Sequence, residues 1–268
     1  MQIIGQKKVI KQLTENTLPT FSLLVGKAGS GKRTLVKYIG EQLKINVALV
    51  DNKIDSIRFM IEDSIALSSD RIYYIGDGDN MGLPAMNALL KLAEEPPKHA
   101  HIIVGVSDPT NVLPTLISRA KLIYLDNFTK DEILQYIKYK RYTDVSQQMV
   151  EIVTTPGEVD KYMEAGFETV YSYAEKVYNN ILKVSTPNSF KIDSKLSYKN
   201  EDGIPIELFM SCFYHIIASA LFKTDSNSLD VKRRMLDITS QCINKLSNKS
   251  FNKQLAFSIW LLDIRSLR

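Results

Sequence analysis

The first residues whose types and spacing could do chemistry form a glycine-rich loop. Residues 26–32 read GKAGSGK, which fits the pattern G-x-x-x-x-G-K of a phosphate-binding loop. In such a loop the backbone N–H groups point at an anion, the next helix adds its positive end, and the lysine reaches the outer phosphates. The alternative is a glycine-rich turn without a ligand. The predicted phosphate-binding residues are Gly26, Gly29, Ser30, Gly31 and Lys32.

The residue after the lysine departs from the pattern. A serine or threonine hydroxyl normally follows and ligates Mg²⁺, but this chain has Arg33. A guanidinium stays protonated and has no lone pair for a metal. Thr34 does not replace the hydroxyl, because one step along a helix turns the side chain by about 100°. We therefore expect a loop that can hold phosphate without a well-formed Mg²⁺ site.

Five apolar runs predict the strands that position this loop. Helical patterns lie between them at about 54–68 and 84–94, and the pattern Leu35, Val36, Ile39, Leu43 follows the loop itself. Strands that alternate with helices of this length indicate an α/β domain with a mostly parallel sheet. The predicted strands are Phe21–Val25, Val47–Val50, Arg71–Ile75, His101–Val106 and Lys121–Leu125.

After Asp126 the pattern becomes all-helical. Asn127–Phe128–Thr129 followed by DEILQYIKYK is typical of a helix start with acidic residues in its first turn. Apolar stripes at helical spacing in the last third indicate core packing of a helical domain. We predict three parts, at 1–126, 127–166 and 167–268. Further helices are expected at about 167–184, 204–223, 229–247 and 250–267.

Composition excludes several classes of protein. The 268 residues are 44% hydrophobic and 24% charged, which is typical of a globular protein rather than a disordered chain. The 34 basic and 30 acidic residues give a net charge of +4, so a uniformly basic nucleic-acid binder is not indicated. Cys212 and Cys242 are too few for a zinc site or a disulfide framework, and the three histidines lack metal-ligand spacing.

The two cysteines and the longest apolar stretch bear on the compartment. Both thiols lie in apolar helical patterns, so we expect them to be buried and free, in a reducing environment. The stretch Phe209–Phe222 is fourteen residues long, which is too short to span a bilayer. The N-terminus lacks the pattern of a signal peptide. The expectation is a cytoplasmic protein with no membrane partner.

Three ordered motifs between Arg71 and Arg119 carry a family resemblance. They are NALLK at 87–91, EEPP at 94–97 and LPTLISR at 113–119. In this order and spacing they resemble AAA+ clamp-loader subunits, most closely the delta-prime subunit of bacterial DNA polymerase III. The resemblance implies an α/β AAA+ P-loop domain at 1–126, a helical lid at 127–166 and a helical collar at 167–268. For NALLKLAEEPP alone, the alternative is an ordinary helix ended by two prolines.

The resemblance also marks positions that have lost their usual residues. Members that hydrolyse ATP carry two consecutive acids after the third strand, one for Mg²⁺ and one for the attacking water. The matching positions are Gly76 and Asp77, so the metal-side acid is absent. Asp77 and Asp79 are carboxylates nearby, but neither restores the pair in register. They have two interpretations, as turn residues or as residues with a metal role, and the first is favoured. In the lid, Asp160 stands where active relatives have an arginine that touches the nucleotide.

Arg119 is the catalytic position that the resemblance leaves intact. In the family this arginine reaches across a subunit boundary to the neighbour's γ-phosphate, as a finger acting in trans. Ala120 replaces the usual cysteine after it, which does not alter the charge. The alternative is a local ion pair of Arg119.

The resemblance implies a delta-prime-like, non-hydrolysing subunit that supplies Arg119 to a neighbouring ATPase. Its expected partners are other clamp-loader subunits, a sliding clamp and primer-template DNA, and its expected ligand is ATP or ADP without a proper Mg²⁺ site and without zinc. One alternative is an active AAA+ ATPase, either a clamp-loader motor subunit or a self-standing enzyme, which the intact loop supports. Another is a scaffold that binds no nucleotide.

Overall fold

The computed structural model describes residues 3–182, 195–198, 203–222, 229–247 and 251–267. The chain divides into two compact units, which are described separately. Unit 1 comprises residues 1–143 and 153–158, and unit 2 comprises residues 144–152 and 159–268. The domain limits expected after residues 126 and 166 stay a prediction.

Unit 1 contains a five-stranded sheet in which every neighbouring pair is parallel. The strand order is β2-β3-β4-β1-β5, so β1 lies between β4 and β5. All five predicted strands are confirmed, with ends that shift by one residue at most. The strands are β1 (Phe21–Val25), β2 (Asn46–Val50), β3 (Arg71–Ile75), β4 (Ala100–Val106) and β5 (Lys121–Tyr124).

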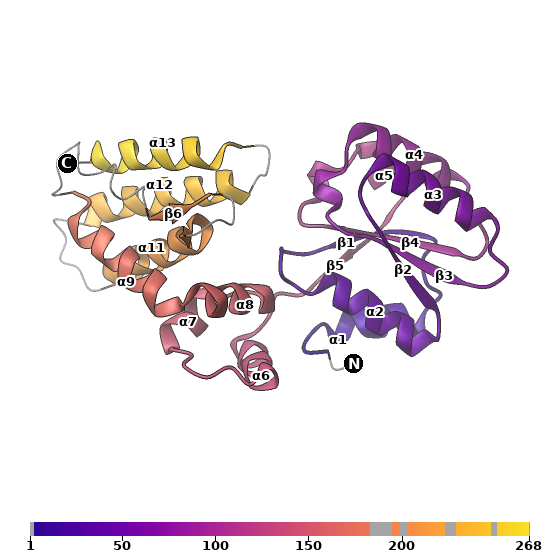
Figure 1. The fold of residues 1–268 in the computed structure, drawn as a ribbon, viewed down its shortest axis with the longest axis horizontal. Coiled ribbons are helices and arrows are strands. Elements are labelled where there is room, and N and C mark those ends of the chain that lie inside the picture. The colour runs from indigo at the N-terminus through magenta and orange to yellow at the C-terminus, as the bar shows by residue number, and fades with distance from the viewer. Residues whose placement is uncertain (1–2, 183–194, 199–202, 223–228, 248–250, 268) are drawn as a thin grey trace. The chain divides into compact units, whose positions relative to one another are not determined.

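Helices cover both faces of this sheet (Figure 1). On one face lie α1 (Lys7–Glu15) and α2 (Lys32–Leu43). On the other lie α3 (Ile54–Ile65), α4 (Leu83–Glu94) and the short α5 (Pro114–Ile117). Two short 3-10 turns, η1 (Gly78–Asn80) and η2 (Pro109–Asn111), follow β3 and β4.

The alternation of side chains along the strands explains the two helical layers. Leu23 and Leu24 of β1 are both fully buried, but they belong to different hydrophobic clusters. Leu23 packs in the cluster that contains Met60 of α3 and Leu89 of α4, and Leu24 in the cluster that contains Ile39 of α2. Successive strand residues point to opposite faces, so an uninterrupted apolar run requires cover on both sides.

A capping box begins α6 (Lys130–Lys140), which lies in unit 1. The Glu132 N–H donates to Thr129 Oγ1 at 3.2 Å, and the Thr129 N–H donates to Glu132 Oε2 at 2.9 Å. The helix start predicted at Asn127–Phe128–Thr129 is thus confirmed, and the physical reason is the reciprocal use of two backbone donors.

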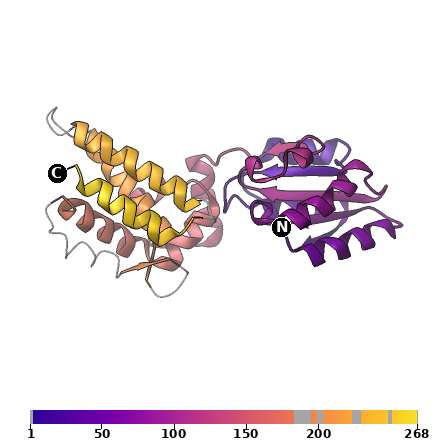
Figure 2. The same cartoon turned by 90° about the horizontal axis from the view of Figure 1, so that it is seen from above.

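Unit 2 is mainly helical. Helices α9 and α12 each pack against α11, and Figure 2 shows α12 and α13 alongside each other. Trp260 lies at the centre of an aromatic cluster, stacked on Phe257 and edge-on to Phe209 and Phe213. The helices are α7 (Gln147–Ile152), α8 (Pro156–Ala165, whose first residues belong to unit 1), α9 (Phe167–Asn180), α11 (Ile206–Leu221), α12 (Leu229–Ser247) and α13 (Lys253–Arg265).

One detail of the C-terminal third differs from the expectation of an all-helical region. Two-residue strands, β6 (Leu196–Ser197) and β7 (Ile204–Pro205), pair in parallel. A two-residue strand is too short to show any periodicity in the sequence. The expected end of the helix at about residue 184 lies outside the described residues.

The cysteines and the helix lengths agree with the sequence. Cys212 and Cys242 are free and buried, and burial raises the pKa of each thiol to about 12. Within the described residues, every helix is too short or too polar to cross a membrane.

The buried hydrogen bond from Trp260 to Thr239 should contribute measurably to the stability of unit 2. Trp260 Nε1 donates to Thr239 Oγ1 at 3.1 Å, and that hydroxyl donates to the Met235 carbonyl at 2.7 Å. Thr239→Val keeps the volume but leaves the indole N–H without its acceptor, so we expect a loss of about 1–3 kcal/mol in the free energy of unfolding. The measurement is urea unfolding followed by fluorescence of Trp260, the one tryptophan of the chain.

Ser258→Ala is the matched control, because Ser258 is exposed on the same helix as Trp260. Its effect should stay within about 0.5 kcal/mol. Equal stabilities of the two variants would mean that the Thr239 bond contributes nothing.

Candidate functional site

The glycine-rich loop begins where β1 ends, at the carboxyl edge of the sheet. The Gly26 N–H donates to the Val106 carbonyl at 3.0 Å, which ties the loop to the end of β4. Gly29 and Gly31 have φ angles of 78° and 79°, a left-handed conformation that glycine adopts without strain. Gly31 is also the N-cap of α2, so the loop leads directly into a helix N-terminus. Both features favour an anion in the loop.

Two side chains of the loop provide polar groups for such an anion. The Lys32 Nζ donates to the carbonyls of Gly26 at 2.5 Å and Lys27 at 3.1 Å. Burial lowers the pKa of Lys32, whereas the nearby carboxylates of Asp79 and Asp77 act to raise it. The Ser30 hydroxyl is buried and has no hydrogen-bond partner. A buried hydroxyl without a partner is costly, and a phosphate oxygen could accept its hydrogen bond.

The structure shows the surroundings of the positions that were predicted to have lost their metal ligands. Arg33 and Thr34 are exposed in the first turn of α2. A Cβ built on Gly76 would have ordinary contact with Tyr74, at 3.6 Å, so packing does not forbid a side chain there. Asp77 is exposed with a left-handed φ of 57°, and its carboxylate accepts a bond from Asn80 Nδ2 at 2.6 Å. The carboxylate of Asp77 thus forms part of a turn.

The carboxylate of Asp79 holds the segment that follows β4. It accepts hydrogen bonds from the backbone N–H groups of Ser107, at 2.7 and 3.0 Å, and Asp108, at 3.0 Å. Burial raises the pKa of Asp79, but the two backbone donors and Asn111 outweigh it, so the pKa lies below its ordinary value. Asp79 therefore ties the turn after β3 to the turn after β4.

A segment far along the sequence packs on the loop. The Gly157 N–H donates to the Gly29 carbonyl at 3.0 Å, and Thr155 Oγ1 donates to the Ala28 carbonyl at 3.3 Å. A Cβ on Gly157 would lie 2.5 Å from the Gly29 Cα, so only glycine permits this approach. Sequence reasoning did not predict these two contacts. The sequence signal in this segment is the Thr155-x-x-Glu158 spacing, which is typical of a helix start. The two residues form a capping box at the start of α8.

Asp160 lies further along α8, half-buried and within unit 2. The glycine-rich loop belongs to unit 1. The assignment of Asp160 to the position where active relatives have a nucleotide-touching arginine stays a prediction.

Arg119 lies at the opposite edge of the sheet from the loop. It stands between α5 and the first residue of β5, and therefore at the amino ends of the strands. Its Nη1 donates to the Thr115 carbonyl at 2.9 Å, and its Nη2 lies 2.9 Å from Glu94 Oε1 in an ion pair. The side chain remains 38% exposed. Sequence reasoning foresaw a local ion pair as the alternative to a finger but did not name Glu94.

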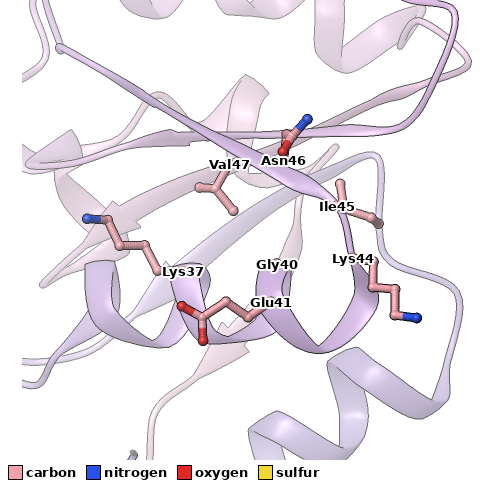
Figure 3. Close-up of a pocket in the computed structure, with 7 residues that line it drawn as sticks. All are labelled: Lys37, Gly40, Glu41, Lys44, Ile45, Asn46 and Val47. Carbon is pink, nitrogen blue, oxygen red and sulfur yellow. The ribbon is translucent and has the colours of Figure 1, made fainter. Parts of the chain in front are cut away.

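A cavity of about 380 Å³ lies elsewhere, between the end of α2 and the start of β2 (Figure 3). A Cβ on Gly40 would lie 2.3 Å from Val47 Cγ2, so this glycine lets the helix approach the strand closely. None of the predicted site residues lines the cavity. The lining residues are Lys37, Gly40, Glu41, Lys44, Ile45, Asn46 and Val47.

The hydrogen bonds of Asp79 lead to a prediction about the free energy of unfolding and its dependence on pH. Asp79→Asn removes the charge that two backbone donors share, so we expect a loss of about 1–2 kcal/mol in the free energy of unfolding at pH 7. The pKa of Asp79 is lowered in the folded chain. The advantage of the wild type should thus be complete above the ordinary carboxyl pKa of about 4 and disappear as the pH falls through the lower, folded value.

The measurement is urea unfolding at a series of pH values, followed by circular dichroism. Asp51→Asn is the control, because Asp51 is exposed just after the neighbouring strand β2. A difference between wild type and Asp79→Asn that stayed constant down to pH 2 would contradict the assignment.

In the comparison with known proteins, the matched family and the sequence relatives are subunits of DNA polymerase III. Residues 44–129 match the family described as DNA polymerase III, delta subunit. The DNA polymerase III subunit gamma of Buchnera aphidicola subsp. Schizaphis graminum is 22% identical over 173 residues, covering 52% of this chain and 48% of that protein. The subunit tau of Bacillus subtilis is 25% identical over 185 residues, covering 56% and 32%. The chain thus spans about half or less of the length of these curated relatives.

A solved structure shares the fold. A DNA polymerase III gamma subunit-related protein of Thermotoga maritima aligns with a TM-score of 0.53 and 18% identity, over 98% of this chain and all of that one. The chain thus shares the fold of that protein, with the predicted α/β domain and a mainly helical remainder. The family match, the sequence relatives and the motif order thus agree that this chain resembles subunits of DNA polymerase III.

Proposed function

We propose that this chain is a delta-prime-like, non-hydrolysing subunit of a clamp loader, which presents Arg119 to the nucleotide of a neighbouring ATPase subunit. The assembly would place a sliding clamp on primer-template DNA during replication. The matched family and the gamma and tau relatives support a place among other clamp-loader subunits.

The position of Arg119 is the observation that carries the proposal. Arg119 precedes β5, and the glycine-rich loop follows β1, the parallel neighbour of β5. The two sites are therefore separated by the length of the strands, about 15 Å for five residues. Arg119 is out of reach of a phosphate in the loop of its own unit, which supports a role toward a phosphate on another molecule. The exposed fraction of its side chain, 38%, leaves it accessible to such a ligand.

Weak metal ligation supports the absence of hydrolysis. Phosphoryl transfer requires a divalent ion on the β- and γ-phosphates and a residue that orients the attacking water. At the matching positions this chain has Arg33 and Gly76, and Asp77 forms part of a turn. The carboxylate of Asp79 is used by the backbone of Ser107 and Asp108.

Phosphate binding is retained in the proposal. The backbone of the glycine-rich loop, the Ser30 hydroxyl and Lys32 would hold the phosphates of ATP or ADP, without a well-formed Mg²⁺ site. The fit rests on the positive φ angles of Gly29 and Gly31 and on the Ser30 hydroxyl, which is buried without a partner. The same loop favours the second candidate, an active AAA+ ATPase. A scaffold that binds no nucleotide is the third.

Loss of the Arg119 guanidinium should slow a neighbouring subunit. In an assembly reconstituted with the other clamp-loader subunits, clamp and primed DNA, we expect Arg119→Ala to lower the kcat of ATP hydrolysis about 100-fold, because the fork stabilises charge in the transition state. Steady-state phosphate release measures it. Arg58→Ala, at an exposed position of α3, is the charge-matched control. An unchanged rate in Arg119→Ala would refute the finger.

The purified chain should bind nucleotide and not turn it over. We expect ATP and ADP to bind with or without Mg²⁺, and Lys32→Ala to weaken binding on the order of tenfold, because a charged donor to phosphate is lost. Isothermal titration measures binding, and phosphate release measures turnover. Lys27→Ala is the control, because Lys27 is an exposed lysine of the same loop.

The two alternatives predict different results in the same experiment. Mg²⁺-dependent turnover that Lys32→Ala abolishes would identify an active ATPase. No binding of either nucleotide would identify the scaffold.

A further inference from the structure

Helix α4 ends on an acidic residue that faces Arg119. Glu94 is the last residue of α4, where the partial negative charge of the helix end disfavours an anion. The Arg119 Nη2 lies 2.9 Å from the Glu94 Oε1, with 38% of the arginine and 52% of the glutamate side chain exposed. The cation thus compensates a carboxylate that the helix end alone would disfavour.

Two further contacts are made by Nη1, the other terminal nitrogen of the same guanidinium. Arg119 Nη1 donates to the Thr115 carbonyl of α5 at 2.9 Å and lies 3.4 Å from the Ser118 hydroxyl. Glu94 and Thr115 belong to different helices, α4 and α5, which are in contact. Because a guanidinium is planar, two contacts at its two terminal nitrogens define the orientation of the whole fork.

Donors remain on the guanidinium for a phosphate. It carries five N–H groups, which is more than the contacts with Glu94, Thr115 and Ser118 use, and 38% of the side chain is exposed. Both side chains are partly exposed, so the pairing with Glu94 leaves the guanidinium accessible from solvent.

We propose that Glu94 is a positioning residue, which holds the Arg119 guanidinium in the orientation that meets the γ-phosphate of a nucleotide bound to a neighbouring subunit. This inference rests on the proposed role of Arg119 in trans. A fork oriented in advance does not have to be ordered when charge develops on the phosphoryl group, so the benefit falls on the chemical step. Glu94 therefore affects kcat more than the KM for ATP.

The test uses the reconstituted assembly with clamp and primed DNA. We expect Glu94→Ala to lower the kcat of ATP hydrolysis roughly tenfold, with a KM for ATP within about twofold of the wild type. Glu94→Gln should lose less, because an amide oxygen can still accept from the fork, more weakly than a carboxylate. Glu95→Gln is the matched control, since Glu95 is the adjacent, exposed acid and only Glu94 lies against Arg119. Its kinetics should equal those of the wild type.

The double variant separates positioning from a general structural role. In the Arg119→Ala background, Glu94→Ala should cause no further loss of kcat, because Glu94 acts through Arg119. A further loss would overturn the inference. Gel filtration verifies that each variant enters the assembly, and if Glu94→Ala does not, the comparison of Glu94→Gln with Glu95→Gln decides.

The outcomes distinguish this inference from the proposed function. If Arg119→Ala slows hydrolysis but the Glu94 variants match Glu95→Gln, the finger stands and the positioning role is wrong. If Arg119→Ala leaves the rate unchanged, both are wrong. A faster rate in Glu94→Ala would show that the carboxylate restrains the arginine, which also contradicts positioning.

Discussion

The parallel direction of all five strands decides what each edge of unit 1 can do. The carboxyl ends place the glycine-rich loop, Asp77 and Asp79 at one edge, and the amino ends place Arg119 and Glu94 at the other. In open parallel sheets the carboxyl edge is where ligands bind. Arg119 at the amino edge and the glycine-rich loop at the carboxyl edge are therefore too far apart to act on the same phosphate.

At the carboxyl edge, the charged side chains of Lys32 and Asp79 are both already hydrogen-bonded to the backbone. Lys32 is partly desolvated, and its Nζ is bonded to carbonyls of its own loop, so an incoming phosphate has to replace those bonds. Asp79 lies close enough to act on the pKa of Lys32, yet its oxygens are bonded to the backbone after β4. A carboxylate used in this way stabilises the edge of the sheet, because two backbone N–H groups there would otherwise need other partners.

Local features of the sequence predicted most of unit 1, and long-range contacts were missed. The five strands were predictable because each is an apolar run between helical patterns, and the glycine loop because its spacing is specific. The contact of Gly157 with Gly29 joins segments separated by more than 120 residues, and no periodicity encodes it. The Glu94 pairing was missed for the same reason, although both residues lie in motifs that marked the family. A motif shows that a residue matters in a family without showing which side chain it touches.

The ion pair and the finger are compatible accounts of Arg119, because they differ in strength and in surroundings. An exposed pair such as this one contributes about 0–1 kcal/mol, so the carboxylate orients the fork without holding it against a stronger ligand. Hydrogen bonds from a guanidinium to phosphate strengthen as water leaves an interface. In the proposed role, the pair is therefore adequate to orient the arginine in the free subunit and too weak to prevent its binding to a phosphate. A buried pair would be harder to break, so the partial exposure of both side chains is compatible with the proposed finger.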